Sequence, residues 1–297
     1  MTTLHYRGRF APSPTGPLHL GSMLSALGSY LQAKNQNGEW LVRIEDLDPP
    51  REIPGAADDI LKTLELFGLH WDGEVSYQSK RQAYYQDALN ELQKNGLLYP
   101  CSCSRKQISE IARSGNIGLV YPGTCRNGQQ QKKSSYAQRL LSKNQKIQFI
   151  DALQGSIEQN IELETGDIAL LRADGFYAYH LAVVVDDHQQ NITEIVRGYD
   201  LIQCTPIQIY LQQCLHYKTP HYLHLPIIVN KQREKLSKQT GAQAVAQHAV
   251  EKTLFQLLKL LQQKPPQDLV DATKTEILRW AIQNWQPISC QKTQIQV

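Results

Sequence analysis

Hydrophobic and polar positions change period several times along the first hundred residues. Short apolar runs at residues 7–11 and 40–44 predict strands. Apolar residues at helical spacing predict helices over residues 18–36, 58–67 and 81–94. Alternation of strand and helix is typical of a parallel sheet with crossover helices. The pattern therefore predicts an α/β fold for this part of the chain.

The character of the chain changes near residue 98, where cysteine, glycine and proline become frequent. Strand-like runs follow at residues 147–150, 156–162 and 167–172. We therefore expect an insertion between two halves of an α/β domain.

The alternation resumes after the expected insertion. The apolar run at residues 181–185 predicts a strand that is buried on both faces. A helix over residues 205–215 and a strand over residues 222–229 are expected next, followed by a lysine-rich loop at residues 230–240. The tail, residues 242–297, has helical periodicity.

Composition restricts the classes of protein that fit. The chain has 297 residues, of which 41% are hydrophobic and 20% charged, which is ordinary for globular domains. No apolar run approaches the roughly 18 residues that a membrane helix needs, so we expect no membrane span. The N-terminus lacks an apolar core that would mark a secretory signal. We therefore expect a cytoplasmic protein whose six cysteines are reduced and available to a metal.

Two segments far apart in the chain suit a polyphosphate. His19, Gly21 and Ser22 follow a Pro/Gly-rich turn and open a helix, whose N-terminus favours phosphate. Lys235 and Lys238 lie in the lysine-rich loop and supply mobile positive charges. Each segment alone fits an ordinary surface loop, whereas the pair indicates nucleotide binding.

The motifs around these segments carry a family resemblance. They are RFAPSPTGPLHLGS from Arg9, RIEDLDPPR at residues 43–51, YQSKR at 77–81, YHLAVVVDD at 179–187, VRGYDL at 196–201 and KLSK at 235–238. In this order they resemble the class I aminoacyl-tRNA synthetases of the glutamyl group. The resemblance departs from the usual signatures at Ser22, which replaces a second histidine, and at Gln239, which follows KLSK.

The resemblance implies a Rossmann-type class I catalytic domain with a zinc-bearing insertion and a short helical C-terminal segment. Residues 1–98 and 177–240 would form the two halves of the catalytic domain. Residues 99–176 would be the insertion, comparable to an acceptor-binding domain. Residues 241–297 would be a helical segment comparable to a stem-contact region, without an anticodon-binding domain.

The implied first reaction is attack of a glutamate carboxylate on the α-phosphate of ATP. A carboxylate is ionised at neutral pH, so catalysis requires positioning and charge stabilisation rather than a general base. His19 and Lys238 are the expected catalytic residues, at the α-phosphate and the pyrophosphate respectively. Gly21, Ser22 and Lys235 are expected to complete the ATP site, with Mg²⁺ as the accompanying ion.

Glutamate recognition requires cations for the side-chain carboxylate and an anion for the ammonium group. Arg9 and Arg197 suit the carboxylate, because a guanidinium binds carboxylates well, and Glu45 suits the ammonium group. A buried arginine would also reject glutamine, whose neutral amide leaves the charge unpaired. By the resemblance, the residues around the amino acid are Arg9, Phe10, Ala11, Pro12, Ser13, Glu45, Tyr179 and Arg197.

Three cysteines in the insertion indicate a metal site. Cys101 and Cys103 form a C-x-C pair, and Cys125 follows within 25 residues, as suits a structural zinc ion. The residues alone leave the fourth ligand open. The C-x-C…Y-x₃-C pattern of the glutamyl-queuosine tRNA(Asp) synthetases matches this sequence and implies Tyr121 as the fourth ligand.

The chain has 59 residues after Lys238 (297 − 238), room for only a short helical segment. In this respect it most resembles the truncated glutamyl-queuosine branch of the glutamyl group. The branch transfers activated glutamate to the cyclopentenediol of queuosine in tRNA(Asp), so the expected partners are L-glutamate, ATP and that tRNA. Three alternatives remain open: a short glutamyl-tRNA synthetase that charges the CCA end, a non-catalytic tRNA-binding paralogue, and a ligase that glutamylates another carrier. We expect a monomer.

The insertion is also rich in basic residues. These side chains could meet RNA phosphates or simply form a solvated surface. They are Arg105, Lys106, Arg113, Arg126, Lys132 and Lys133.

Overall fold

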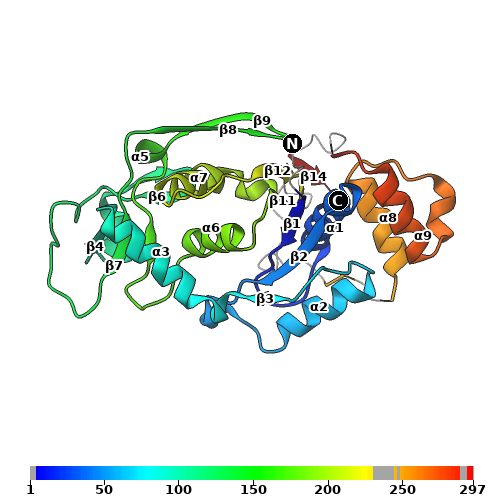
Figure 1. Ribbon diagram of the computed structural model, residues 1–297, viewed down its shortest axis with the longest axis horizontal. Helices are drawn as coiled ribbons and strands as arrows, with labels where there is room; N and C mark the ends of the chain where they lie inside the picture. The colour runs from blue at the N-terminus through cyan, green and yellow to red at the C-terminus, as the bar shows by residue number, and fades with distance from the viewer. Residues whose placement is uncertain (1–4, 230–243, 246–247, 288–292, 297) are drawn as a thin grey trace.

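Parallel strands and the helices between them form the N-terminal part of the fold (Figure 1). The computed structural model describes residues 5–229, 244–245, 248–287 and 293–296. Strand β1 pairs in parallel with β2, and β2 with β3. The elements are β1 (Arg7–Phe10), α1 (Leu20–Asn35), β2 (Glu39–Ile44), α2 (Ala56–Leu66), β3 (Ser76–Tyr77) and α3 (Gln82–Lys94). The alternation predicted for this part of the chain is confirmed.

A second parallel pair, β11 and β12, continues the fold beside β1. The two parts meet where the Thr193 amide donates to the Arg7 carbonyl at 2.9 Å. Arg197 lies opposite His224 in the register of this pair. The elements of this part are α6 (Tyr179–Gln189), β11 (Glu194–Gly198), α7 (Thr205–Cys214), β12 (His221–Leu225) and β13 (Ile227–Val229).

Two secondary-structure predictions for this second part are wrong. The apolar run at residues 181–185 is not a strand, because it lies inside helix α6. This helix packs against α3 and α7 and buries the whole run, so its sequence lacks the polar face that marks an amphipathic helix. The predicted strand over residues 222–229 is broken at Pro226 into β12 and β13, because proline has no amide hydrogen for a sheet.

The insertion forms the end of the molecule farthest from the C-terminal helices (Figure 1). Strands β4, β7 and β10 make a small antiparallel sheet. The β8–β9 hairpin reaches back to the catalytic part, where Asp151 pairs in parallel with Tyr222 of β12. Its elements are β4 (Leu98–Cys101), α4 (Arg105–Ile111), β5 (Arg113–Gly115), β6 (Gly118–Val120), β7 (Ala137–Leu140), β8 (Lys146–Asp151), β9 (Gly155–Asn160), α5 (Ile161–Glu164) and β10 (Ala169–Leu171).

The C-terminal helices α8 (Val250–Leu260) and α9 (Lys274–Asn284) pack against α1. The predicted helical periodicity is confirmed in α8, whose Leu254, Leu257 and Leu258 are buried in one core with α1 and β1. Strand β14 (Gln294–Gln296) pairs in parallel with β13. No helix among the described residues is both long and apolar enough to cross a lipid bilayer.

Candidate active site

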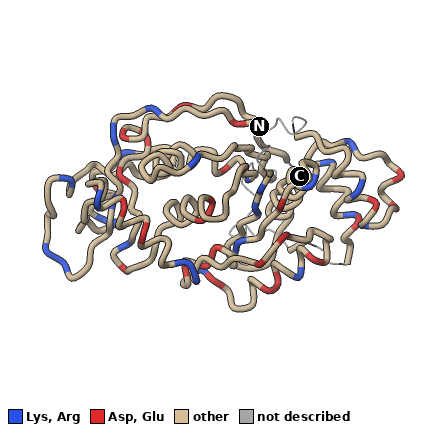
Figure 2. Tube along the Cα trace, viewed as in Figure 1, with Lys and Arg blue, Asp and Glu red and all other residues tan. Residues whose placement is uncertain are grey.

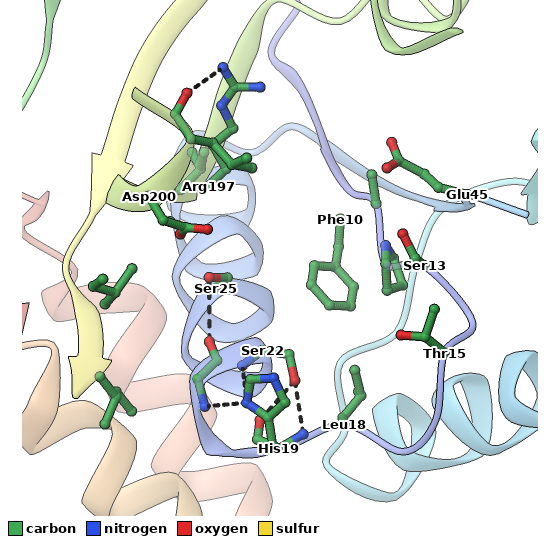
Figure 3. A pocket seen from close by; sticks show the side chains of 18 of the residues that line it. Phe10, Ser13, Thr15, Leu18, His19, Ser22, Ser25, Glu45, Arg197 and Asp200 are labelled. Atoms are coloured by element: carbon green, nitrogen blue, oxygen red, sulfur yellow. Dashed lines mark hydrogen bonds between the residues drawn. The ribbon is translucent and has the colours of Figure 1, made fainter. Parts of the chain in front are cut away.

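A cavity of about 440 Å³ opens at the carboxyl ends of β1, β2, β11 and β12, where ligands bind in parallel α/β sheets. Figure 3 shows His19 and Ser22 at one end of this cavity and Arg197 and Glu45 at the other. Lining it are Arg9, Phe10, Ala11, Pro12, Ser13, His19, Gly21, Ser22, Glu45, Tyr179 and Arg197. The structure thus brings together the predicted ATP and glutamate residues that lie within its described part. Lys235, Lys238 and Gln239 lie outside the described residues.

Further residues line the cavity that the sequence analysis did not single out. They are Thr15, Leu18, Ser25, Val196, Gly198, Asp200, Leu201, Pro226, Ile227 and Ile228. The last three follow the carboxyl end of β12, so a correctly bounded strand would have indicated them.

His19 is the N-cap of α1, and its side chain is held by the helix it begins. Its Nδ1 accepts from the amides of Gly21 at 3.1 Å and Ser22 at 3.3 Å. Ser22 Oγ accepts in return from the His19 amide at 2.9 Å, which completes a capping box. An accepting Nδ1 in a neutral imidazole places the proton on Nε2. The Gly21 and Ser22 amides are therefore engaged by His19, so a phosphate at this end would meet the positive end of the α1 dipole and the imidazole ring.

The chain borders this end of the cavity on both sides of the undescribed lysine segment. Ile227 and Ile228 of β13, just before it, line the cavity. Just after it, the Val245 amide donates to the Leu18 carbonyl at 3.0 Å, and Ala244 forms a bridge with His19. The described residues on either side of residues 230–243 therefore lie beside the end of the cavity that His19 borders.

Arg9 is buried at the other end of the cavity and is paired with Asp187 of α6. Its Nε donates to Asp187 Oδ1 at 3.0 Å and its Nη2 to Oδ2 at 3.4 Å. Arg43 Nη1 donates to the same Oδ1 at 2.8 Å. Burial alone would raise the pKa of Asp187, but the two arginines hold it below its usual value. Asp187 is thus an ionised bridge that fixes both guanidinium groups.

Glu45 follows β2 and lies beside these arginines. Its Oε1 is 3.5 Å from Arg43 Nη2. Burial raises the pKa of Glu45 to about 7, although Arg43 and Arg9 act to lower it. A positively charged ligand group would favour the ionised form and bind to it.

Arg197 reaches the cavity from β11 and is 5% exposed. Its Nε donates to His224 Nε2 at 3.0 Å and its Nη2 to Thr205 Oγ1 at 2.8 Å. Its Nη1 is buried and has no hydrogen-bond partner among the described residues. A buried, unpaired guanidinium nitrogen is costly, and a ligand carboxylate would satisfy it.

The partners of the arginines are functional residues that the sequence analysis missed. Asp187 lies at the end of the quoted YHLAVVVDD motif, but the wrong strand assignment for residues 181–185 hid its position on a helix. The signal for His224 is a histidine between two leucines, Leu223 and Leu225, in strand β12. Its contact with Arg197 depends on the pairing of two strands and is not visible in the chain order.

The three cysteines of the insertion converge as predicted. The Sγ atoms of Cys101, Cys103 and Cys125 all lie within 4.8 Å of one another. Tyr121 Oη lies 3.3 Å from Cys101 Sγ and 3.5 Å from Cys103 Sγ, and the Sγ atoms of Cys103 and Cys125 are 3.6 Å apart. Ligands around a tetrahedral zinc ion, with bonds of about 2.0–2.3 Å, lie about 3.3–3.8 Å apart. The four side chains therefore fit a small, closed metal site.

The basic residues of the insertion differ in their surroundings. Arg126 is tied to Asp167 at 2.6 Å and to Glu162 at 2.6 Å, so its role is structural. Arg105, Lys106, Arg113, Lys132 and Lys133 are exposed. Figure 2 shows acidic and basic residues interspersed along the whole trace.

Comparison with known proteins places these features in a family. The family described as tRNA synthetases class I (E and Q), catalytic domain, matches residues 5–263. A Glutamyl-Q tRNA(Asp) synthetase from Dechloromonas aromatica is 52% identical over 282 residues, covering 94% of this chain and 94% of the relative. One from Chromobacterium violaceum is 51% identical over 285 residues, covering 96% of this chain and 95% of the relative.

Solved structures share the fold. A glutamate tRNA ligase from Elizabethkingia meningosepticum superposes with a TM-score of 0.79 at 24% identity, covering 98% of this chain and 66% of its own. A glutamate-tRNA synthetase from Elizabethkingia anophelis gives a TM-score of 0.80 at 24% identity, covering 99% and 68%. The chain therefore belongs to the class I tRNA synthetases of the glutamate and glutamine group, in the branch of the glutamyl-Q tRNA(Asp) synthetases.

Proposed function

We propose that the chain activates L-glutamate with ATP and transfers it to the queuosine base of tRNA(Asp). The observation that carries the proposal is the cavity, which has buried arginines and Glu45 at one end and the N-terminus of α1 at the other. An amino acid with a second carboxylate suits the first end, and the α-phosphate of ATP suits the second. The acceptor, queuosine in tRNA(Asp), is inferred from the names of the relatives.

Arg9 and Arg197 are the proposed ligands of the glutamate side chain. Two nitrogens of each guanidinium donate to protein groups, and Nη1 of Arg197 is buried with no hydrogen-bond partner among the described residues. The carboxylate would therefore receive one nitrogen from each arginine rather than both from one. Glu45 would accept from the ammonium group, with Tyr179 as a further wall of the site.

In the first reaction, an oxygen of the glutamate α-carboxylate forms a bond to the α-phosphorus of ATP. The bond from that phosphorus to the bridging oxygen breaks, and pyrophosphate leaves. His19 Nε2–H would donate to an α-phosphate oxygen, and Lys235 and Lys238 are expected to receive the pyrophosphate. Mg²⁺ bound to ATP would supply positive charge at the phosphates.

In the second reaction, a hydroxyl oxygen of the cyclopentenediol forms a bond to the activated carbonyl carbon. The bond from that carbon to the phosphate oxygen breaks, AMP leaves, and the hydroxyl proton passes to the phosphate of AMP or to solvent. A smaller cavity of about 200 Å³ adjoins the first and shares Ser13, Thr15, Glu45 and Tyr179 with it. We propose that the acceptor reaches the activated carbonyl through this second cavity.

Two assays test the proposal. ATP–pyrophosphate exchange that depends on glutamate and needs no tRNA is expected; its absence would leave the non-catalytic paralogue as the better hypothesis. Labelled glutamate is then offered to tRNA(Asp) with and without queuosine. Labelling that requires queuosine is expected, whereas labelling of tRNA(Glu) alone would support a CCA-charging enzyme. Exchange without labelling of any tRNA would support a ligase with another carrier.

We further propose that the cysteine cluster holds one structural zinc ion, with Tyr121 as the fourth ligand. Although burial acts to raise the pKa of Cys125, hydrogen bonds from Tyr121 and the backbone lower it to about 6, which favours the thiolate that zinc requires. The four donors leave no open position for substrate, so the ion would stabilise the insertion.

The proposed setting is the cytoplasm, where tRNA and ATP are present. We also propose a monomer. Sedimentation analysis at micromolar concentration tests this, and a stable dimer would contradict it.

A further inference from the structure

A polar row of three buried side chains crosses the sheet behind the cavity. Asp151 of β8, His224 of β12 and Arg197 of β11 are 1%, 0% and 5% exposed. Arg197 lies directly opposite His224 in the parallel register, and β8 pairs with β12 where Asp151 meets Tyr222. Strand pairing thus places in one row three residues that are far apart in the chain.

The hydrogen bonds along this row have a fixed direction. His224 Nδ1 lies 2.6 Å from Asp151 Oδ2, and Arg197 Nε lies 3.0 Å from His224 Nε2. A guanidinium nitrogen can only donate, so His224 Nε2 accepts and the imidazole proton is on Nδ1. Asp151 accepts a hydrogen bond from this Nδ1–H. It thereby selects the His224 tautomer whose Nε2 can accept a hydrogen bond from Arg197 Nε.

The charge states agree with this direction. Burial lowers the pKa of His224 to about 4, although Asp151 acts to raise it, so the imidazole is neutral at physiological pH. Burial acts to raise the pKa of Asp151, but its bond to His224 and the amides of Leu153 and Gln154 hold it below its usual value. Asp151 is therefore a carboxylate.

The row decides which face of Arg197 meets the cavity. His224 holds Nε, and Thr205 Oγ1 holds Nη2 at 2.8 Å. The remaining terminal nitrogen, Nη1, is the one without a partner among the described residues. Without the His224 acceptor, Nε would be unpaired in the interior and the guanidinium could rotate to satisfy it.

We propose that His224 and Asp151 are positioning residues for amino-acid recognition, which orient the Arg197 guanidinium so that Nη1 meets the side-chain carboxylate of the substrate. The inference rests on the proposed function, because it takes glutamate as the substrate. The same proposal makes His224 and Asp151 determinants of the preference for glutamate over glutamine. A guanidinium held in one orientation discriminates a carboxylate from an amide more strongly than one that is free to turn.

A pair of matched substitutions separates this role from packing. In His224→Asn, the amide reproduces the Nδ1 donor toward Asp151 but loses the acceptor toward Arg197. In His224→Gln, the longer amide can place an oxygen where Nε2 accepts. We expect His224→Asn to raise the glutamate KM in ATP–pyrophosphate exchange about tenfold or more, since a buried donor loses its partner. We expect the glutamate KM of the His224→Gln variant to lie within about threefold of wild type. In both variants we expect kcat to change less than KM.

Asp151→Asn tests the tautomer. Its amide nitrogen can donate to His224 Nδ1, which would move the imidazole proton to Nε2 and set two donors against each other at Arg197. We expect a raised KM for glutamate and a reduced preference for glutamate over glutamine in kcat/KM. Thermal unfolding of each variant, followed without substrate, measures any change in packing.

The outcomes separate this inference from the proposed function. No glutamate-dependent exchange in the wild type would overturn the proposed function, and this inference with it. Exchange in the wild type with an unchanged KM and selectivity in His224→Asn and Asp151→Asn would overturn the inference alone. Equal KM changes in His224→Asn and His224→Gln that track a fall in Tm would assign His224 a packing role and also overturn it.

Discussion

Glu45 is expected to make glutamate binding depend on pH. Burial raises its pKa to about 7, against the lowering effect of Arg43 and Arg9. The carboxylate is therefore ionised above pH 7 and protonated below it, and only the ionised form can pair with an ammonium group. We expect the glutamate KM in ATP–pyrophosphate exchange to rise as pH falls from about 8 to 6, approaching tenfold per pH unit below the pKa.

Glu45→Gln is the control for this dependence. The amide cannot ionise, so KM should be high at every pH and lose its rise between pH 8 and 6. A wild-type KM that stays flat over this range would contradict the assignment of Glu45 to the ammonium group.

At this same scale, the sequence predicted residues that line the cavity better than residues that hold those side chains in place. Arg9, Glu45 and Arg197 could be predicted because they lie in motifs that resemble the glutamyl group, whose dicarboxylic amino acid requires such groups. Asp187 and His224 could not, because each acts through a contact between elements that are distant in the chain. Such partners depend on register and helix packing, which no local pattern encodes.

The elements themselves differ in how well their sequences reveal them. Helices such as α8, which have one apolar face, follow the predicted periodicity closely. Helix α6 is buried from Leu181 to Asp187, and its Val183–Val185 run resembles a strand, because β-branched residues are frequent in sheets. Burial on all sides removes the period that distinguishes the two, so only the tertiary structure corrects the assignment.

The cysteine cluster links β4 to the loop after β6, and its removal should destabilise the insertion. Cys101→Ala removes one of three converging thiols. We expect its zinc content, measured by metal analysis of the purified protein, to fall from one ion per chain to near zero, with a lower Tm. Cys214→Ala is the matched control, because this thiol lies in α7 outside the cluster. Zinc content unchanged in Cys101→Ala, or lowered equally in both variants, would contradict the site.

One hydrophobic core joins the C-terminal helices to the helix that carries the phosphate end of the site. Leu257 of α8 is fully buried in the core that also contains α1 and β1. Leu257→Ala should lower the free energy of unfolding by about 2–5 kcal/mol, because less apolar surface is buried and a cavity is left behind. Denaturant unfolding measures this. Gln256→Ala, on the exposed face of the same helix, should stay within about 0.5 kcal/mol of wild type.

A similar fall in stability in the two variants would contradict the placement of α8 on α1. The result bears on function, because His19 is the N-cap of α1 and depends on the position of that helix. Helices α8 and α9 therefore support the helix that His19 begins.

At the scale of the whole molecule, the chemistry and the binding of RNA should be separable. The net charge of +3 is small, and acidic and basic residues are interspersed (Figure 2), so phosphate binding must depend on local groups. Arg105 and Lys106 are exposed at the start of α4, at the insertion end of the molecule. We expect Arg105→Ala with Lys106→Ala to weaken binding of tRNA(Asp). The slope of log K against log salt concentration should become shallower by about 0.7 for each RNA phosphate that the double variant no longer neutralises. Glutamate-dependent exchange should be unchanged in the double variant. Lys252→Ala, exposed on α8, is the control and should change neither tRNA binding nor exchange. Wild-type tRNA affinity in the double variant, with weakened binding in Lys252→Ala, would move the RNA-binding surface from the insertion to the C-terminal helices.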